Sequence, residues 1–113
     1  MERIRARVLP REGSTPVLLL GAIREYASQE TRNPWVVRSR RPFVLEHRSP
    51  RAEGVRYELS KDGDAVSLLI AGARARLGLA YAMTMLASAR FSEHVGRVEL
   101  ELPTPPAQRR GRR

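Results

Sequence analysis

Hydrophobic and polar residues alternate strictly at the start of the chain. In residues 2–9, Ile4, Ala6 and Val8 alternate with three arginines, and a period of two is typical of a β-strand with one buried face. Residues 97–102 show the same alternation, with valine and leucine between arginine and glutamate. The pattern therefore predicts a half-buried strand at each of these two places.

Two other segments have a helical period. The first begins at Thr15, a good N-cap, and at Pro16, which suits the first helical position because its missing N–H has no partner there anyway. We expect this helix to end between Gln29 and Asn33. The second segment covers residues 73–91, and its large apolar residues cover more than one face. Such a helix is either buried on several sides or packed against another subunit.

The middle of the chain predicts further strands. Residues 35–48 favour one long strand, or two short ones interrupted at Pro42, which cannot donate to a ladder. Residues 55–61 and 64–70 alternate on either side of Asp62-Gly63, a dipeptide favoured in two-residue hairpin turns. Pairing around that turn sets three pairs of residues opposite each other on one face: Leu59 and Val66, Tyr57 and Leu68, Val55 and Ile70.

The order of these elements is strand, helix, one or two strands, hairpin, helix and strand. This order predicts an α+β two-layer sandwich, in which a mostly antiparallel sheet of four to six strands carries two helices on one face. We assign residues 1–102 to a single domain. From Pro103 the apolar periodicity stops, so residues 103–113 predict a flexible basic tail.

The composition adds a strong positive charge to this picture. The net charge is +9 over 113 residues, and every basic residue except Lys61 is an arginine. A guanidinium group is planar and always charged, and it can fork onto phosphate oxygens or stack on a base. A polyanion is therefore the first partner to consider, although a GC-rich genome or adaptation to heat also explains the skew. The chain has no cysteine, which excludes disulfides and cysteine-ligated zinc.

Arginines and aromatic residues are interleaved between positions 35 and 48. Arginine neutralises phosphates, and an accessible aromatic ring stacks on an unpaired base, which contributes about 1–3 kcal/mol per base. The segment therefore predicts a surface for single-stranded nucleic acid formed by Trp35, Arg38, Arg40, Arg41, Phe43 and Arg48. The alternative is that Trp35 and Phe43 belong to the core and that the arginines only protect an edge strand.

A second basic stripe lies on the polar face of the first predicted strand, at Arg3, Arg5 and Arg7. Like charges about 7 Å apart on one strand face can follow a phosphate backbone. If the first and last strands are neighbours, however, Glu99 and Glu101 can pair with these arginines instead. The sequence leaves both alternatives open.

The tail supplies a third basic candidate. A mobile arm of this kind raises the affinity for any polyanion without reading sequence. The alternatives are a solubilising terminus and a contact with an acidic partner protein. The arginines concerned are Arg109, Arg110, Arg112 and Arg113.

The second predicted helix supplies a candidate of another kind, a protein interface. Its broad apolar surface favours a homo-oligomer, or an accessory subunit that docks on a larger RNA- or DNA-processing assembly. The residues concerned are Leu77, Tyr81, Met83, Met85 and Leu86.

Catalysis has little support in the sequence. His47 and His94 are the only histidines, and the chain has no phosphate-binding glycine loop or dinucleotide fingerprint. We therefore predict a protein that is not an enzyme and that uses no metal or cofactor. No apolar run reaches the ~20 residues of a membrane-spanning helix, and we expect a cytoplasmic protein.

Three segments carry a resemblance to a known family: Trp35–Arg48, the Asp62-Gly63 hairpin and Leu77–Leu86. In a small, arginine-rich chain without cysteine, they resemble the ThermoDBP-related single-stranded DNA-binding proteins of thermophilic archaea. The likeness lies in size, composition and layout across residues 1–102. It implies a small antiparallel sheet with helices, a basic cleft with aromatic residues, and oligomerisation. We therefore expect a non-catalytic protein that binds single-stranded DNA, with RNA as the other possible partner.

Overall fold

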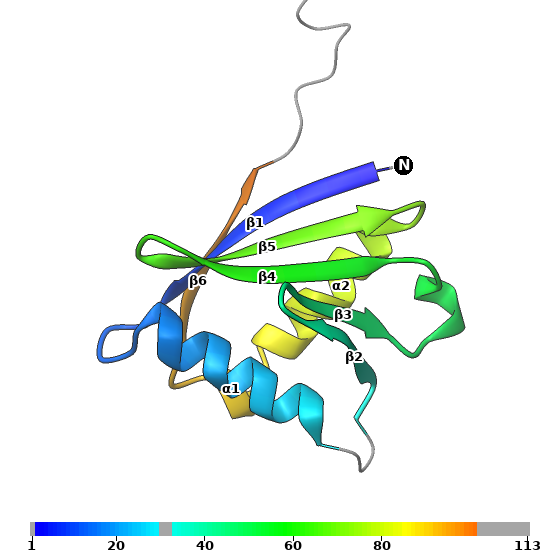
Figure 1. The fold of residues 1–113 in the computed structure, drawn as a ribbon. Coiled ribbons are helices and arrows are strands. Elements are labelled where there is room, and N and C mark those ends of the chain that lie inside the picture. Colours follow the sequence, from blue (N-terminus) through cyan, green and yellow to red (C-terminus); the bar gives the residue numbers. More distant parts are fainter. Residues whose placement is uncertain (1, 30–32, 102–113) are drawn as a thin grey trace, which may run out of the picture.

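The computed structural model describes residues 2–29 and 33–101. They form two layers, a six-stranded sheet and two helices that pack against one of its faces (Figure 1). The predicted α+β sandwich is therefore confirmed. The elements along the chain are β1 (Glu2–Pro10), α1 (Pro16–Ser28), β2 (Trp35–Arg40), β3 (Phe43–His47), β4 (Arg56–Asp62), β5 (Ala65–Gly72), α2 (Ala75–Leu86) and β6 (Val95–Glu101), with 3-10 turns at Pro50–Ala52 and Ala89–Phe91.

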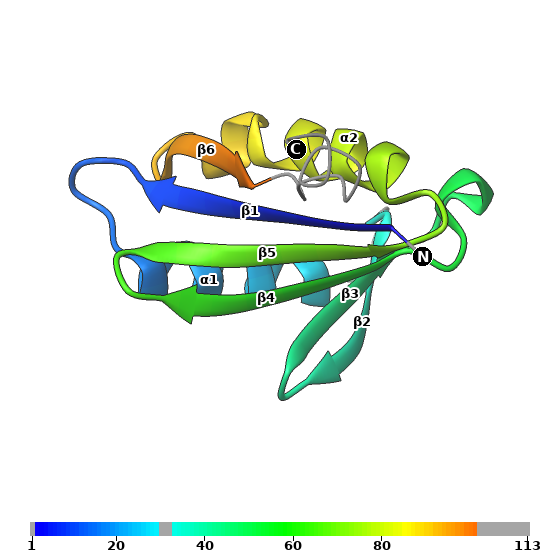
Figure 2. The ribbon, with the colours of Figure 1, turned by 90° about the horizontal axis from the view of Figure 1, so that it is seen from above.

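The strands follow the order β2-β3-β4-β5-β1-β6, and all neighbours are antiparallel. The first strand of the chain thus lies second from one edge of the sheet, between β5 and β6. Figure 2 looks onto the face opposite the helices, which we call the open face, and shows α1 passing beneath β4 and β5. Neither described helix is long and apolar enough to cross a membrane.

Local sequence explains both ends of α1. The side chain of Thr15 accepts a hydrogen bond from the N–H of Leu18 at 3.1 Å, as expected of the N-cap. At the other end, the side-chain amide of Asn33 donates to the carbonyl oxygens of Tyr26 and Gln29. The last carbonyls of a helix lack its regular i+4 partners, and here the backbone N–H of Gln29 also donates to the Tyr26 carbonyl at 3.1 Å. The residues of α1 that are buried beneath the sheet are Leu19, Ile23 and Ala27.

Helix α2 is shorter than expected and ends at Leu86, before the separate turn at Ala89–Phe91. It lies close to the sheet because Gly78 has no side chain. A Cβ at this position would lie 2.6 Å from Cγ1 of Val55 and 2.9 Å from the hydroxyl oxygen of Tyr57. That hydroxyl donates to the carbonyl oxygen of Gly78 at 2.9 Å, which ties the helix to β4.

The β4–β5 hairpin exists, but its predicted register is wrong by two residues. The two turn residues are Gly63 and Asp64, and Leu59 faces Leu68 rather than Val66. Gly63 occupies the first central turn position with φ +63°, which a primed hairpin turn requires there. A shift of two residues leaves every side chain on its predicted face. The apolar side of the hairpin is therefore still buried.

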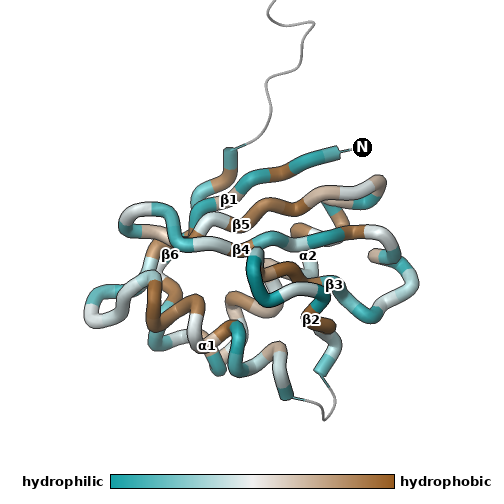
Figure 3. Tube along the Cα trace, viewed as in Figure 1, coloured by the Kyte–Doolittle hydropathy of each residue, from teal (hydrophilic) through white to brown (hydrophobic). Residues whose placement is uncertain are grey.

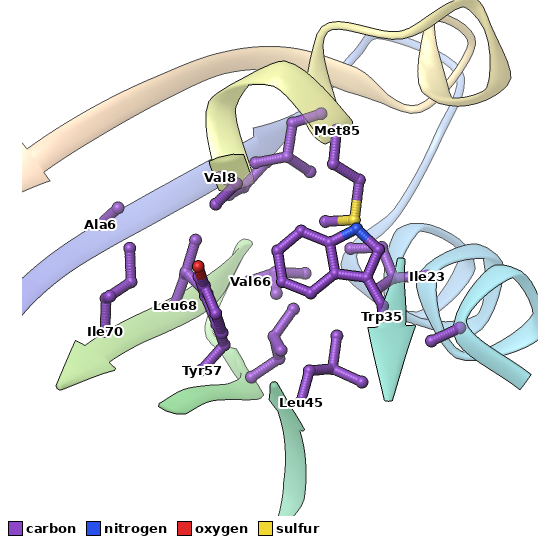
Figure 4. Packing of buried hydrophobic residues seen from close by; sticks show 14 of the residues in the cluster. Ala6, Val8, Ile23, Trp35, Leu45, Tyr57, Val66, Leu68, Ile70 and Met85 are labelled. Atoms are coloured by element: carbon purple, nitrogen blue, oxygen red, sulfur yellow. The ribbon is translucent and has the colours of Figure 1, made fainter. Parts of the chain in front are cut away.

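The core lies between the sheet and the helices. Figure 4 shows side chains from β1, β4 and β5 meeting Ile23 of α1 and Met85 of α2. In Figure 3 the hydrophobic stretches lie mainly on β5 and the helices, while the peripheral turns are hydrophilic. One hydrophobic cluster therefore holds both layers together.

Strand β2 contains a β-bulge at Arg38. Val37 faces Leu45 and Ser39 faces Val44, so Arg38 is an extra residue without a partner in β3. One extra residue reverses the alternation of the residues that follow. Arg40 consequently pairs with the buried Phe43 and lies on the helix side of the sheet.

Candidate nucleic-acid interface

The two aromatic residues predicted to stack on bases are buried. Only 2% of Trp35 and 3% of Phe43 is exposed. The indole packs edge-on against Tyr57 and His47, with ring centroids 4.8 Å apart in both cases, and Figure 4 shows it inside the core. The prediction of an accessible ring at these positions is therefore wrong. Both residues lie on the helix side of their strands, where aromatic side chains bury the most apolar area.

The arginines of the same segment nevertheless gather around a groove. It lies between the second half of α1 and the β2–β3 hairpin, and it comprises two adjacent hollows of about 200 and 420 Å³. The hollows share Ser28, Val37 and Arg40 in their walls. We define the arginine groove by its four basic residues: Arg24, Arg40, Arg41 and Arg48.

The described walls of the groove supply no charge that neutralises its arginines. No carboxylate occurs among the described residues that line it. The guanidinium of Arg24 lies 5.0 Å from the centroid of the Phe43 ring, and Nε of Arg48 donates to the carbonyl oxygen of Asn33 at 2.8 Å. These partners are uncharged. Arg40 and Arg41 are exposed, and neither forms an ion pair with another described residue.

Arg38 does not join this groove. Its Nε lies 2.9 Å from Oε1 of Glu46, and Nε of Arg56 lies 3.5 Å from the other oxygen of the same carboxylate. A separate hollow of about 440 Å³, lined in part by Arg38, Arg48 and Glu46, also includes Glu53. Two carboxylates thus offset the arginines on that side of the hairpin.

The stripe on β1 divides between the two alternatives. β1 and β6 are neighbours, with Arg7 facing Glu99 and Arg5 facing Glu101. Arg7 lies within ion-pair distance of three carboxylates, on Asp62, Asp64 and Glu99, at 3.0 to 3.7 Å, and is fully engaged. Arg3 and Arg5 form no ion pair with a described residue, and Nη1 of Arg5 lies 3.5 Å from Oγ of Ser67.

Sequence reasoning missed Arg24. It lies on α1 four residues before Ser28, so both side chains share one side of the helix. That spacing was visible in the sequence. Its significance depends on β2 lying beside this part of α1, which only the tertiary structure shows.

The predicted apolar surface of α2 is largely used inside the protein. Met85 is 9% exposed and Leu86 only 3%, because α2 packs on β1 and β5. Tyr81 is half-buried and stacks on His47, with ring centroids 4.2 Å apart and an interplanar angle of 4°. Leu77 and Met83 are also half-buried. Met85 and Leu86 are therefore core residues and not interface residues, which is the alternative of burial on several sides. Among the described residues, the exposed large hydrophobic side chains are Val17, Leu18 and Leu100.

The two histidines have structural partners. Nδ1 of His47 accepts a hydrogen bond from the backbone N–H of Ser49 at 3.0 Å, and burial lowers the pKa of the imidazole. The neighbouring Glu46 points to the open face, so the two side chains do not act together. His94 shares a hydrogen bond of 2.8 Å with the hydroxyl of Ser14, which connects the loops before α1 and β6.

The basic tail, with Arg109, Arg110, Arg112 and Arg113, lies outside the described residues. Comparisons with protein-family models, with curated proteins and with solved structures found no match to this chain. The resemblance to the ThermoDBP-related proteins therefore stays a prediction.

Proposed function

We propose that the protein binds single-stranded nucleic acid in the arginine groove, without catalysis. The observation that carries this proposal is the meeting of four arginines around a concave surface with no carboxylate among its described lining residues. Oriented cations in a cleft concentrate a polyanion there more effectively than the same charges scattered over a surface. DNA is the first candidate, and RNA is an outcome of the test.

The proposed contacts are of two kinds. Arg40 and Arg41 are exposed, and their guanidinium groups would donate to phosphate oxygens. Arg24 is exposed above Phe43, and its planar group would offer a stacking surface to an unpaired base. Guanidinium stacking would thus replace the direct contact expected of Trp35.

The shape of the groove favours single strands over a duplex. Duplex readers insert a protruding helix or β-ribbon into the major groove, whereas the arginines here surround a hollow. The binding would tolerate any sequence and would weaken with salt, with log K falling by about 0.7 per tenfold salt for each phosphate contacted.

Fluorescence polarisation with labelled oligo-dT, oligo-rU and a DNA duplex tests the proposal at two salt concentrations. The double variant Arg40→Gln/Arg41→Gln should bind oligo-dT roughly tenfold more weakly and lose about 1.4 units of salt slope. The matched control is Arg38→Gln/Arg56→Gln, which removes the same charge from the open face and should change the affinity less than about twofold.

Two results would contradict the proposal. Equal losses in the two double variants would mean that only net charge matters and that the groove has no special role. Failure of the unaltered protein to bind any of the three probes at low salt would remove the function altogether.

A further inference from the structure

The two edge strands of the sheet differ in how well they are protected from pairing. β2 is interrupted by the bulge at Arg38, and such irregularity hinders pairing with another strand. β6 pairs with β1 along its length, and its register shifts only opposite Leu9 and Pro10. No other described strand pairs with the second edge of β6. Alternate N–H and C=O groups on that edge point away from β1.

The sequence of β6 is complementary to itself in the antiparallel direction. With Glu99 at the centre, Arg97 of one copy faces Glu101 of a second copy, and Val98 faces Leu100. Both charged pairs then lie on the open face, and both apolar pairs on the helix side. Centring on Val98 would place Leu100 opposite Gly96, and centring on Leu100 would place Glu99 opposite Glu101. The Glu99 register pairs Arg97 with Glu101 and Val98 with Leu100, and it leaves one like-charge pair, Glu99 opposite Glu99, at the centre.

Within the described part of the single chain, two of these residues have no partner. Leu100 is 48% exposed although it lies on the helix side of the sheet. Glu101 faces Arg5 across the ladder but forms no ion pair with a described residue. The central Glu99 is already held by Arg97 at 2.9 Å and by Arg7 at 3.7 Å. In a dimer each Arg97 would be shared between Glu99 of its own chain and Glu101 of the second copy, and each Arg7 would stay beside its own Glu99, so the two Glu99 carboxylates would meet with cations on both sides.

We infer that β6 pairs with β6 of a second copy in a twofold-symmetric dimer centred on Glu99, with the six-stranded sheets of the two copies joined into one. In the dimer, Val98 of the second copy would pack against Leu100, and Arg97 of the second copy would pair with Glu101. β2 lies at the far edge of each sheet from β6 (Figure 2), so the arginine groove beside β2 stays accessible. This inference does not depend on the proposed function.

Light scattering coupled to size exclusion, over a range of micromolar concentrations, tests the dimer. The unaltered protein should have the mass of two copies. Because of the twofold symmetry, the pair of residues 97 and 101 occurs twice in the dimer. Arg97→Glu makes both pairs Glu–Glu and Glu101→Arg makes both pairs Arg–Arg, so each variant should raise the dimer dissociation constant by about tenfold or more. The double variant Arg97→Glu/Glu101→Arg restores opposite charges and should recover the dimer.

The control is Arg56→Glu, a charge reversal on the open face remote from β6, which should leave the mass unchanged. Circular dichroism establishes that each variant is folded. A folded, unaltered protein that remains a single copy at all concentrations overturns the inference. So does a dimer that neither single reversal weakens, or one that the double variant fails to restore.

Discussion

The arginines of the groove and those of the open face are the same residue type in opposite surroundings. On the open face, Arg7, Arg38 and Arg56 lie within 2.9 to 3.7 Å of carboxylates on other strands or in the β4–β5 turn. In the groove, Arg24 rests on an aromatic ring and Arg48 on a backbone carbonyl. The count of arginines therefore says little about where a polyanion binds. Under the proposed function, the positions of the carboxylates decide which arginines are free to bind it.

One extra residue in β2 places neighbouring arginines of this strand in different sets, Arg38 on the open face and Arg40 in the groove. Arg38 and Arg40 are two positions apart, and regular alternation would place both on one face of the sheet. The bulge at Arg38 sends Arg40 to the helix side, where α1 contributes Arg24. The groove is thus a consequence of an irregular edge strand.

The largest expected effect concerns the floor of the groove. Trp35→Ala should lower the free energy of unfolding by about 3–5 kcal/mol, measured by urea denaturation, because it empties a buried site between the layers. Trp35→Leu keeps an apolar side chain there. The folded fraction of this variant should bind oligo-dT with an affinity within about twofold of that of the unaltered protein, because the proposed contacts are made by the arginines.

Direct stacking would give the opposite result for the same variant. Loss of a stacked base is worth about 1–3 kcal/mol, so the affinity of folded Trp35→Leu would fall at least fivefold. That outcome would show that the indole becomes exposed on binding. The groove would then depend on its ring as much as on its cations.

The elements that local patterns determine could be predicted from the sequence. The alternation of residues 2–9 and the Thr15-Pro16 helix start both recur in the structure. The hairpin turn could not be settled, because Asp62-Gly63 and Gly63-Asp64 both suit a primed turn and both keep the apolar residues on one face. Choosing between them depends on how the ends of β4 and β5 meet the other strands.

The candidate site was predictable only in part. The segment 35–48 was correctly singled out as rich in arginine, and three of its arginines do line the groove. The direction of Trp35, the bulge at Arg38 and the arrival of Arg24 were not predictable. Each depends on pairing with residues far away in the sequence, which single-residue propensities do not contain.

The next largest effect concerns the tail. A chain that ends at residue 102 lacks four arginines and should bind oligo-dT and duplex alike about tenfold more weakly, with up to about 3 units less salt slope. The loss caused by Arg40→Gln/Arg41→Gln should persist in this shorter chain. If the shorter chain no longer binds at all at low salt, the arm rather than the groove carries the affinity.

A smaller effect should follow from removing a carboxylate instead of an arginine. Glu46→Gln deprives Arg38 and Arg56 of their shared partner, so polarisation should show oligo-dT binding about two- to threefold more tightly. The control is Glu58→Gln on the same face, because Glu58 forms no ion pair with a described arginine. Equal gains in both variants would mean that net charge, and not local pairing, separates the two sets of arginines.

The smallest effect concerns pH. Burial lowers the pKa of His47, so the unfolded chain takes up a proton more readily than the folded protein does, and the free energy of unfolding should decrease as the pH falls below about 6.5. Urea denaturation at pH 7.5 and 5.5 should show a smaller decrease for His47→Gln.

Guanidinium groups keep their charge over this range. The affinity of the folded protein for oligo-dT should therefore stay constant between pH 7.5 and 6.5, whereas a rise on acidification would mean that a titrating cation contributes to the groove.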